Sequence, residues 1–311
     1  METGKGGSRV AAVVLAAGMS SRMGTPKQLL RLGENTLLGH TLGNVRRSQV
    51  SEIVLVLGFA AEEIKQLVPA DDLKVVINPV FQEGMASSLR AGLSALGPDS
   101  EAALIILADQ PFIQPATLNQ LIDHHQQFSP QILLPLYKGF RGNPVLLDRS
   151  IFPELMKLTG DVGCRAIFGG HVEGIHKLPV DDVGILIDVD QHSDAEKLAS
   201  GREKLEAAVR QMPDVEGQAI PGQPELVIIG QEAVARALAA IGRLLHFSIT
   251  MVDPLLTRQD LPEADLILHI LDFSRLPVHA DRYVVVASHG RFDEEALQQA
   301  LSTDQPYIAI V

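Results

Sequence analysis

Short apolar runs alternate with amphipathic stretches along the whole chain. Each run is too short to form a helix and is rich in Val, Ile and Leu, which is typical of buried parallel β-strands. In the first half of the chain these runs are Val10–Leu15, Ile53–Leu57, Leu73–Ile77, Ala103–Leu107, Ile132–Leu136 and Val145–Leu147. The pattern therefore predicts a series of strands in this part of the sequence.

Helical patterns occupy the stretches between these runs. The segment Thr36–Arg47 places Leu38 and Val45 on one helical face, and similar patterns occur at Ser87–Leu96 and Ala116–Phe128. Alternation of strands and helices predicts an α/β domain with a mainly parallel sheet covered by helices on both faces. Ligands of such sheets bind beyond the carboxyl ends of the strands, so we expect a functional site there.

The second half of the chain divides in two. A helical pattern at residues 193–212 is followed by Pro213–Pro224, which is rich in Pro and Gly and is predicted to be a linker. A second, smaller α/β pattern follows, with strands expected at Glu225–Ile229, Ser248–Val252, Leu266–Leu271, Tyr283–Ala287 and Tyr307–Val311 and a helix at Glu232–Leu245. We therefore predict one domain over residues 8–212, a linker over 213–224 and a Rossmann-like α/β domain over 225–311.

Composition narrows the classes of function. The 311 residues carry 26 Lys and Arg against 38 Asp and Glu, a net charge of −12, which disfavours a nucleic-acid-binding surface. Cys164 is the single cysteine, so a disulfide within the chain and an all-cysteine zinc site are excluded. The apolar runs are far shorter than a membrane span, and Met1–Arg9 has no secretory pattern. We expect a cytoplasmic protein that binds neither nucleic acid nor membrane.

A glycine-rich segment directly follows the first predicted strand. Gly18 and Gly24 can adopt backbone angles that other residues avoid, and such a loop can point several N–H groups at an anion. Arg22 can grip phosphate oxygens with its planar guanidinium, and Lys27 can place a compact positive charge beside them. The segment has neither the Walker ending nor the Rossmann glycine pattern. An ordinary turn with two solvated cations is the alternative.

Carboxylates follow two other predicted strands. Asp109 comes directly after Ala103–Leu107, and Asp188 and Asp190 end a later apolar stretch. Two carboxylates from separate strand ends suit Mg²⁺, with phosphate oxygens and water completing its coordination. Helix capping or a turn is the alternative role for each aspartate.

Polar loops that could contact substrates lie elsewhere in the same predicted domain. Gly84, Ser87 and Ser88 stand near the start of a predicted helix and offer donors to a nucleotide, although Ser87 could simply cap the helix. Gly139–Pro144 and Gly160–Arg165 are two further glycine loops, each with one arginine that could meet an anionic group or form surface ion pairs.

These motifs resemble a known family. The pattern Leu-Ala-Ala-Gly-x-Ser-x-Arg-Met-Gly-x-x-Lys-x-Leu-Leu runs unbroken from Leu15 to Leu30 and is similar to the signature of the molybdenum cofactor nucleotidyltransferases. Leu107–Pro111, Glu83–Gly92 and the two arginine loops resemble further family segments. The resemblance spans residues 10–198 and implies a glycosyltransferase-A-like NTP transferase fold. It implies that the acceptor is molybdopterin cofactor and that Mg²⁺, or Mn²⁺ in its place, is required.

The resemblance also assigns roles to residues. It implies nucleotide binding by Leu15, Ala16, Ala17, Gly18, Ser20, Ser21, Arg22, Lys27, Asn78, Gly84, Ser87 and Ser88, and acceptor binding by Arg141, Gly142, Asp161 and Arg165. Lys27, Arg22 and Asp109 would be the catalytic residues, and Asp109 and Asp190 would hold the metal. Gln191 and His192 stand where the family has Thr and Pro, which leaves the choice between Asp188 and Asp190 open; we favour Asp190.

Ala17 decides the expected nucleotide. Within the family, Ala-Ala-Gly is more typical of CTP users and Ala-Gly-Gly of GTP users, so Ala16-Ala17-Gly18 implies cytidylyl transfer from CTP. Guanylyl transfer and transfer to a sugar or alcohol phosphate are the enzymatic alternatives. A non-catalytic carrier of molybdenum cofactor is the alternative of another class.

The C-terminal pattern resembles a different family. Ser288–Asp293 and Pro306–Ile308 are similar to the Rossmann-like domain of accessory proteins for xanthine and carbon monoxide dehydrogenases. Of the dinucleotide fingerprint this domain keeps Gly230, whereas Glu232 would repel a pyrophosphate, so we do not expect NAD(P) binding. The resemblance implies a molybdenum hydroxylase as the partner that receives the finished cofactor.

Overall fold

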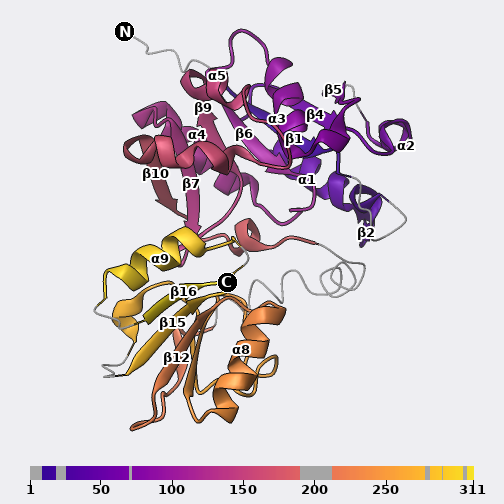
Figure 1. Cartoon of the computed structure of the whole chain (residues 1–311). Helices are drawn as coiled ribbons and strands as arrows, with labels where there is room; N and C mark the ends of the chain where they lie inside the picture. The colour runs from indigo at the N-terminus through magenta and orange to yellow at the C-terminus, as the bar shows by residue number, and fades with distance from the viewer. Residues whose placement is uncertain are drawn as a thin grey trace. The chain divides into compact units, whose positions relative to one another are not determined.

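The computed structural model describes residues 9–18, 26–69, 72–189, 212–276, 281–288, 290–303 and 307–311. The chain forms two compact units (Figure 1). The first comprises Met1–Pro135 and Gly142–Arg202, and the second comprises Leu136–Arg141 and Glu203–Val311. The predicted helix at residues 193–212 lies almost entirely outside the described residues.

The first sheet has the order β10-β7-β9-β6-β1-β4-β5, with β8 paired to β7. Its strands are β1 Val10–Ala16, β4 Ile53–Leu57, β5 Lys74–Ile77, β6 Ala102–Leu107, β7 Ile132–Tyr137, β8 Phe140–Arg141, β9 Val145–Asp148 and β10 Ile175–Pro179. Strands β6, β1, β4 and β5 are parallel, whereas β9 runs antiparallel to both β6 and β7. The predicted mainly parallel α/β sheet is thus confirmed.

Helices cover both faces of this sheet (Figure 1). They are α1 Leu37–Arg46, α2 Ala61–Leu67, α3 Met85–Ser94, α4 Pro115–Phe128 and α5 Phe152–Leu155. Alternate residues of β1 enter opposite cores: Val14 packs with residues of α1 and α4, and Val13 packs with residues of α3 and α5. Gly92 lets α3 approach closely, because a Cβ there would lie 2.4 Å from Cγ1 of Val13.

Short elements complete the first unit. The 3₁₀ turns are η1 Lys27–Leu29, η2 Phe81–Glu83, η3 Arg149–Ile151, η4 Cys164–Gly170, η5 Val172–Gly174 and η6 Val183–Leu186. Strands β2 Arg31–Leu32 and β3 Asn35–Thr36 form a small hairpin just before α1. The Thr36 side chain caps α1 by accepting a hydrogen bond from the Gly39 N–H at 3.0 Å. None of the helices in the described ranges combines the length and apolar character that crossing a bilayer requires.

The second unit is a Rossmann-like sheet with the order β11-β14-β13-β12-β15-β16. Its elements are β11 Val215–Gly217, β12 Glu225–Ile229, α8 Ala233–Leu244, β13 Ser248–Val252, β14 Leu266–Leu268, η7 Phe273–Arg275, β15 Arg282–Val286, α9 Asp293–Leu301 and β16 Tyr307–Ile310. All neighbouring strands are parallel except β11, which runs antiparallel to β14. Strand β11 lies within the segment that the sequence predicted to be a linker, where pairing with β14 supplies order that composition does not show.

Asp253 is a buried acid at the carboxyl end of β13. Its side chain is 1% exposed, and its Oδ1 accepts a hydrogen bond from the Leu255 N–H at 2.9 Å. Oδ2 has no hydrogen-bond partner among the described residues. Burial is the main reason that the pKa of this carboxyl rises from the ordinary 3.8 to about 6. The folded unit therefore carries an unfavourable buried charge at neutral pH.

We predict that Asp253→Asn stabilises the second unit at pH 7.5 and has little effect at pH 4.5. Because the folded pKa lies above the unfolded value, the wild-type unit loses stability as pH rises from about 4 to about 6, and the neutral amide avoids this loss. Two pKa units correspond to about 3 kcal/mol at most.

Tyrosine fluorescence during thermal unfolding would measure this effect. The chain has no Trp, and its three tyrosines, Tyr137, Tyr283 and Tyr307, all belong to the second unit. An equal shift of the unfolding midpoint at both pH values would contradict the assignment to Asp253 ionisation.

Candidate active site

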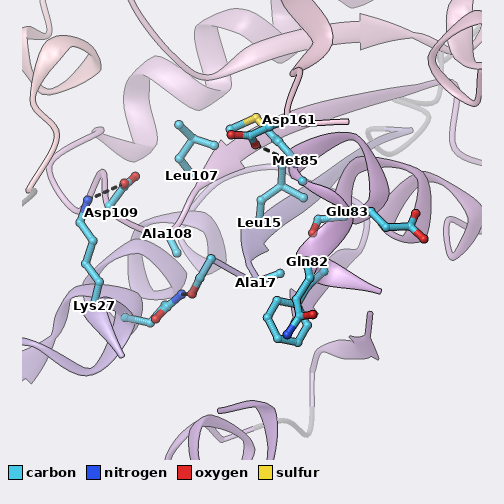
Figure 2. A pocket seen from close by; sticks show the side chains of 15 residues that line it. Leu15, Ala17, Lys27, Gln82, Glu83, Met85, Leu107, Ala108, Asp109 and Asp161 are labelled. Atoms are coloured by element: carbon cyan, nitrogen blue, oxygen red, sulfur yellow. Dashed lines mark hydrogen bonds and ion pairs between the residues drawn. The ribbon is translucent and has the colours of Figure 1, made fainter. Parts of the chain in front are cut away.

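A pocket of about 520 Å³ lies at the carboxyl ends of β1 and β6 in the first unit (Figure 2). Strand β1 and the residues after it contribute Leu15, Ala17 and Gly18 to its wall. Strand β6 and the residues after it contribute Leu107, Ala108 and Asp109. Residues of η1, η2 and the first turns of α3 complete the wall together with Asp161. The pocket thus occupies the edge at which the sequence predicts a ligand site.

Lys27 and Asp109 meet across this pocket (Figure 2). Lys27 Nζ donates to Asp109 Oδ2 at 2.8 Å, and the two side chains are 16% and 30% exposed. Asp109 Oδ1 is buried and has no hydrogen-bond partner among the described residues. A carboxylate oxygen that lacks a donor is able to bind a divalent metal, because Mg²⁺ prefers oxygen ligands. The residues present therefore fit the metal that the sequence predicts.

Gln28 fixes the start of the glycine loop. Its side-chain Nε2 donates to the carbonyl oxygens of Ala16 at 2.9 Å and Gly18 at 3.3 Å. The carbonyl oxygen between them, on Ala17, accepts from the Phe59 N–H at 3.4 Å. Three consecutive carbonyls are thus held, and this orders the backbone where the predicted phosphate loop begins. Gln28 directly follows Lys27, but it is not among the site residues predicted from the sequence.

Asn78, Ser87 and Ser88 form one buried network. Asn78 Nδ2 donates to Ser87 Oγ at 2.8 Å and to Ser88 Oγ at 3.1 Å. Ser87 Oγ can in turn donate to the carbonyl oxygen of Gly84 at 2.8 Å. These bonds hold the start of α3 against the end of β5. Ser88 and Gly84 line the pocket, whereas Asn78 and Ser87 brace them, so direct nucleotide contact by Asn78 and Ser87 stays a prediction.

Gly84 joins the predicted nucleotide and acceptor segments. Its φ is +101°, and a Cβ there would lie 2.5 Å from the Asp161 Cα. Asp161 Oδ1 accepts from the Met85 N–H at 3.1 Å, and the Gly160 carbonyl accepts from the Ala86 N–H at 3.2 Å. The first turn of α3 is therefore capped by the loop that carries Asp161, a wall residue of the pocket (Figure 2).

The other predicted acceptor residues lie elsewhere. Arg141 belongs to the second unit, where its Nη1 lies 3.4 Å from Glu294 Oε2 and 3.6 Å from Glu295 Oε1. Gly142 belongs to the first unit, and a Cβ there would lie 2.4 Å from the carbonyl oxygen of Ile185. Arg165 is half-buried in η4. Acceptor binding by these three residues stays a prediction.

The second predicted acid segment reaches Asp109. The Val189 N–H donates to the carbonyl oxygen of Asp109 at 3.0 Å, and Asp188 accepts from Gln110. Asp190 itself lies outside the described residues, as do Ser20, Ser21 and Arg22. Within the described ranges no group of three or more His, Cys, Asp or Glu could hold a metal ion.

We predict that Gly84→Ala destabilises the first unit by roughly 1–3 kcal/mol, the cost of a strained backbone at positive φ. It should also increase hydrogen exchange in the first turn of α3, because the added Cβ pushes the Asp161 loop away. Gly43→Ala in α1 is the matched control, since nothing lies within 4 Å of a Cβ there. If both variants unfold alike and exchange alike, the close packing at Gly84 is not required.

Two family models match the chain. Residues 12–175 match the MobA-like NTP transferase domain, and residues 226–311 match the XdhC Rossmann domain. The two matches fall on the two halves that the sequence analysis assigned to different families.

Characterised relatives cover the first half. Molybdenum cofactor cytidylyltransferase of Escherichia coli is 23% identical over 60% of this chain and 94% of its own length. Nicotine blue oxidoreductase of Paenarthrobacter nicotinovorans is 29% identical over 50% of this chain and 79% of its own length. The bifunctional protein GlmU of Methylobacillus flagellatus is 35% identical over 37% of this chain, and the match spans a quarter (25%) of GlmU.

A solved structure shows the same fold. The crystal structure of Rv0371C in complex with manganese, from Mycobacterium tuberculosis, superimposes with a TM-score of 0.55 at 31% identity. It covers 63% of this chain and all (100%) of its own. The similarity is thus to a complete chain that corresponds to the first half of this one.

Proposed function

The chain belongs to the MobA-like NTP transferase family and carries an XdhC Rossmann domain, and from this premise we propose that it transfers CMP from CTP to the phosphate of molybdopterin cofactor. The family match shows that the chain is a nucleotidyltransferase of the MobA-like type. The choice of CTP and of the molybdopterin acceptor is the proposal. The observation that carries it is the pairing of Lys27 with Asp109, whose Oδ1 lacks a donor among the described residues, in the wall of a pocket large enough for a nucleotide.

The chemistry requires little more than positioning and charge. An oxygen of the acceptor phosphate attacks the α-phosphorus of CTP in line, a new P–O bond forms, and the bond to the β-phosphate breaks with its electron pair leaving on pyrophosphate. Lys27 offsets charge on the triphosphate, and Arg22 is expected to hold phosphate oxygens. No protein nucleophile is required.

Divalent metal fits the same site. Asp109 and, by resemblance, Asp190 would hold Mg²⁺, which when bound offsets negative charge on the triphosphate and the leaving pyrophosphate. Mn²⁺ is expected to substitute, and the manganese complex of the Mycobacterium tuberculosis relative supports this. Lys27 keeps the Asp109 carboxylate in place through the bond to Oδ2.

Two observations favour CTP and molybdopterin. Ala17, the residue that separates the two family patterns, lies in the pocket wall. Its carbonyl oxygen accepts from the Phe59 N–H, and Gln28 holds the carbonyl oxygens of Ala16 and Gly18 on either side. The Escherichia coli relative is named as a molybdenum cofactor cytidylyltransferase. The XdhC domain supports a link to a molybdenum hydroxylase as receiving partner. We place this small-molecule reaction in the cytoplasm, without nucleic acid or membrane.

The alternatives are distinguishable by one reaction product. A guanylyltransferase or a sugar- or alcohol-phosphate transferase, which the partial GlmU match favours, also releases pyrophosphate but with another substrate pair. A carrier of molybdenum cofactor releases none, and neither does an oxidoreductase of the kind named for the Paenarthrobacter nicotinovorans relative. Pyrophosphate release is therefore the decisive measurement.

We expect pyrophosphate release with Mg²⁺, molybdopterin cofactor and CTP, and little release with GTP, ATP or UTP. Preference for GTP would keep the mechanism but contradict the role of Ala17. Release that requires a sugar phosphate would replace the acceptor. If no nucleotide and acceptor pair released pyrophosphate, nucleotidyl transfer would be contradicted and the carrier hypothesis would remain.

We predict that Lys27→Ala and Asp109→Ala each lower kcat at least about 100-fold, the scale of losing one preorganised charge contact. Steady-state pyrophosphate release would measure this. Lys157→Ala and Asp72→Ala are matched controls with exposed charges outside the pocket, and they should retain wild-type kcat. Near-normal turnover of both pocket variants would refute the assigned roles.

A further inference from the structure

Gln110 links the two acid-bearing segments of the candidate site. It directly follows Asp109 and is 2% exposed. Its Nε2 donates to Asp188 Oδ1 at 2.5 Å across 78 residues of sequence. Asp188 is itself exposed, so this bond holds a surface carboxylate from inside the protein. Gln110 lies within the family-like segment Leu107–Pro111, but it is not among the site residues or metal ligands that the sequence predicts.

The chemistry of the pair fixes how the amide is oriented. An ionised carboxylate only accepts hydrogen bonds, so the NH₂ group of Gln110 must face Asp188 and its oxygen must face away. That oxygen is buried and has no partner among the described residues. Gln110, Thr41 and Asn44 line a small cavity of about 10 Å³ beneath the loop. The amide therefore has one productive orientation, with the donor toward the acid.

Helix α1 anchors the loop that carries Gln110. Thr41 Oγ1 donates to the carbonyl oxygen of Ala108 at 3.2 Å, and Asn44 Nδ2 donates to that of Pro111 at 2.8 Å. Both α1 side chains, Thr41 and Asn44, are buried. Gln110 thus extends from a backbone that is fixed on both sides.

The segment before Asp188 is fixed as well. Asp182 Oδ2 accepts from the Gln114 N–H at 2.9 Å and from Thr117 Oγ1 at 2.6 Å, which ties the segment to the start of α4. Val189 beyond Asp188 donates to the Asp109 carbonyl at 3.0 Å. Between these points the exposed Asp188 side chain accepts from Gln110, so the amide contributes to where that carboxylate lies.

We propose that Gln110 is a positioning residue that holds the Asp188 carboxylate beside Asp109, so that Asp188 supplies a carboxylate to the divalent cation of the nucleotide complex. This inference rests on the proposed nucleotidyl transfer. It assigns Asp188 a role in the metal site in addition to the Asp190 that the sequence favours. Partners that orient metal-binding carboxylates typically affect metal affinity about 10- to 100-fold.

Mn²⁺ binding to the full chain with CTP and without acceptor tests this, because free Mn²⁺ can be followed by electron paramagnetic resonance without turnover. We expect Gln110→Met, which keeps the volume but loses the donor, to raise the Mn²⁺ Kd about 10-fold. Asp188→Ala should raise it similarly. In the Asp188→Ala background Gln110→Met should add less than twofold, since the amide acts through that carboxylate.

Gln131→Met is the matched control. It also removes an amide side chain, but the partner of that amide is His171 and not an acidic residue of the candidate site. It should leave the Mn²⁺ Kd unchanged, and all variants should keep the wild-type circular dichroism spectrum. Asp188→Asn can still accept a hydrogen bond from Gln110 but lacks the negative charge. It should therefore raise the Mn²⁺ Kd as much as Asp188→Ala does.

Three outcomes would overturn the inference. An unchanged Kd in Gln110→Met would show that the amide does not position a metal ligand. If Gln110→Met raised the Mn²⁺ Kd 10-fold in the Asp188→Ala background too, the amide would act through a group other than Asp188. Both results leave CTP binding by the wild type intact and so spare the proposed function, whereas failure of the wild type to bind Mn²⁺ with any nucleotide would overturn both.

Discussion

The ion pair between Lys27 and Asp109 depends on parallel pairing of β1 with β6. These strands are in matched register up to Leu15 and Leu107, so the chain leaves both at the same edge of the sheet. Residues 82 positions apart in sequence thereby meet at 2.8 Å. The proposed positions of phosphate and metal both rest on this lysine and on the carboxylate oxygen of Asp109 that lacks a donor among the described residues. Around this pair, Gln28 bonds the backbone of Ala16 and Gly18, and Gln110 bonds Asp188.

Sequence patterns predicted the strands that lie in the interior of each sheet. Strands β1, β4, β12 and β13 match their predicted runs to within a residue, because a strand buried on both faces is mostly apolar. The direction of β9 was not predicted, because an apolar run looks the same in sequence whether its strand pairs in parallel or antiparallel. The seven-residue helix α2 was also missed, as it has little length over which a period can show. Strand β11 depends on its partner β14 rather than on its own composition.

The sequence analysis named Lys27 and Asp109, which meet in the pocket wall, but not two amide side chains that brace the same region. Lys27 and Asp109 were found because their side chains carry charge in a motif with fixed spacing. Gln28 and Gln110 were not, because an amide shows its role only through a partner that is distant in sequence or a carbonyl across a loop. For the same reason Asn78 and Ser87 resemble ligand donors in sequence, while in the structure they bond to each other.

The packing at Gly84 has a consequence for how new substrate preferences can arise. Where one residue without a side chain separates the predicted nucleotide wall from the loop of Asp161, neither surface can be remodelled in isolation. A larger residue at position 84 would push the Asp161 loop away, and a larger residue in that loop would push away the first turn of α3. Directed evolution of this scaffold toward another base would therefore need paired libraries, with residues 81–88 and 158–163 randomised together.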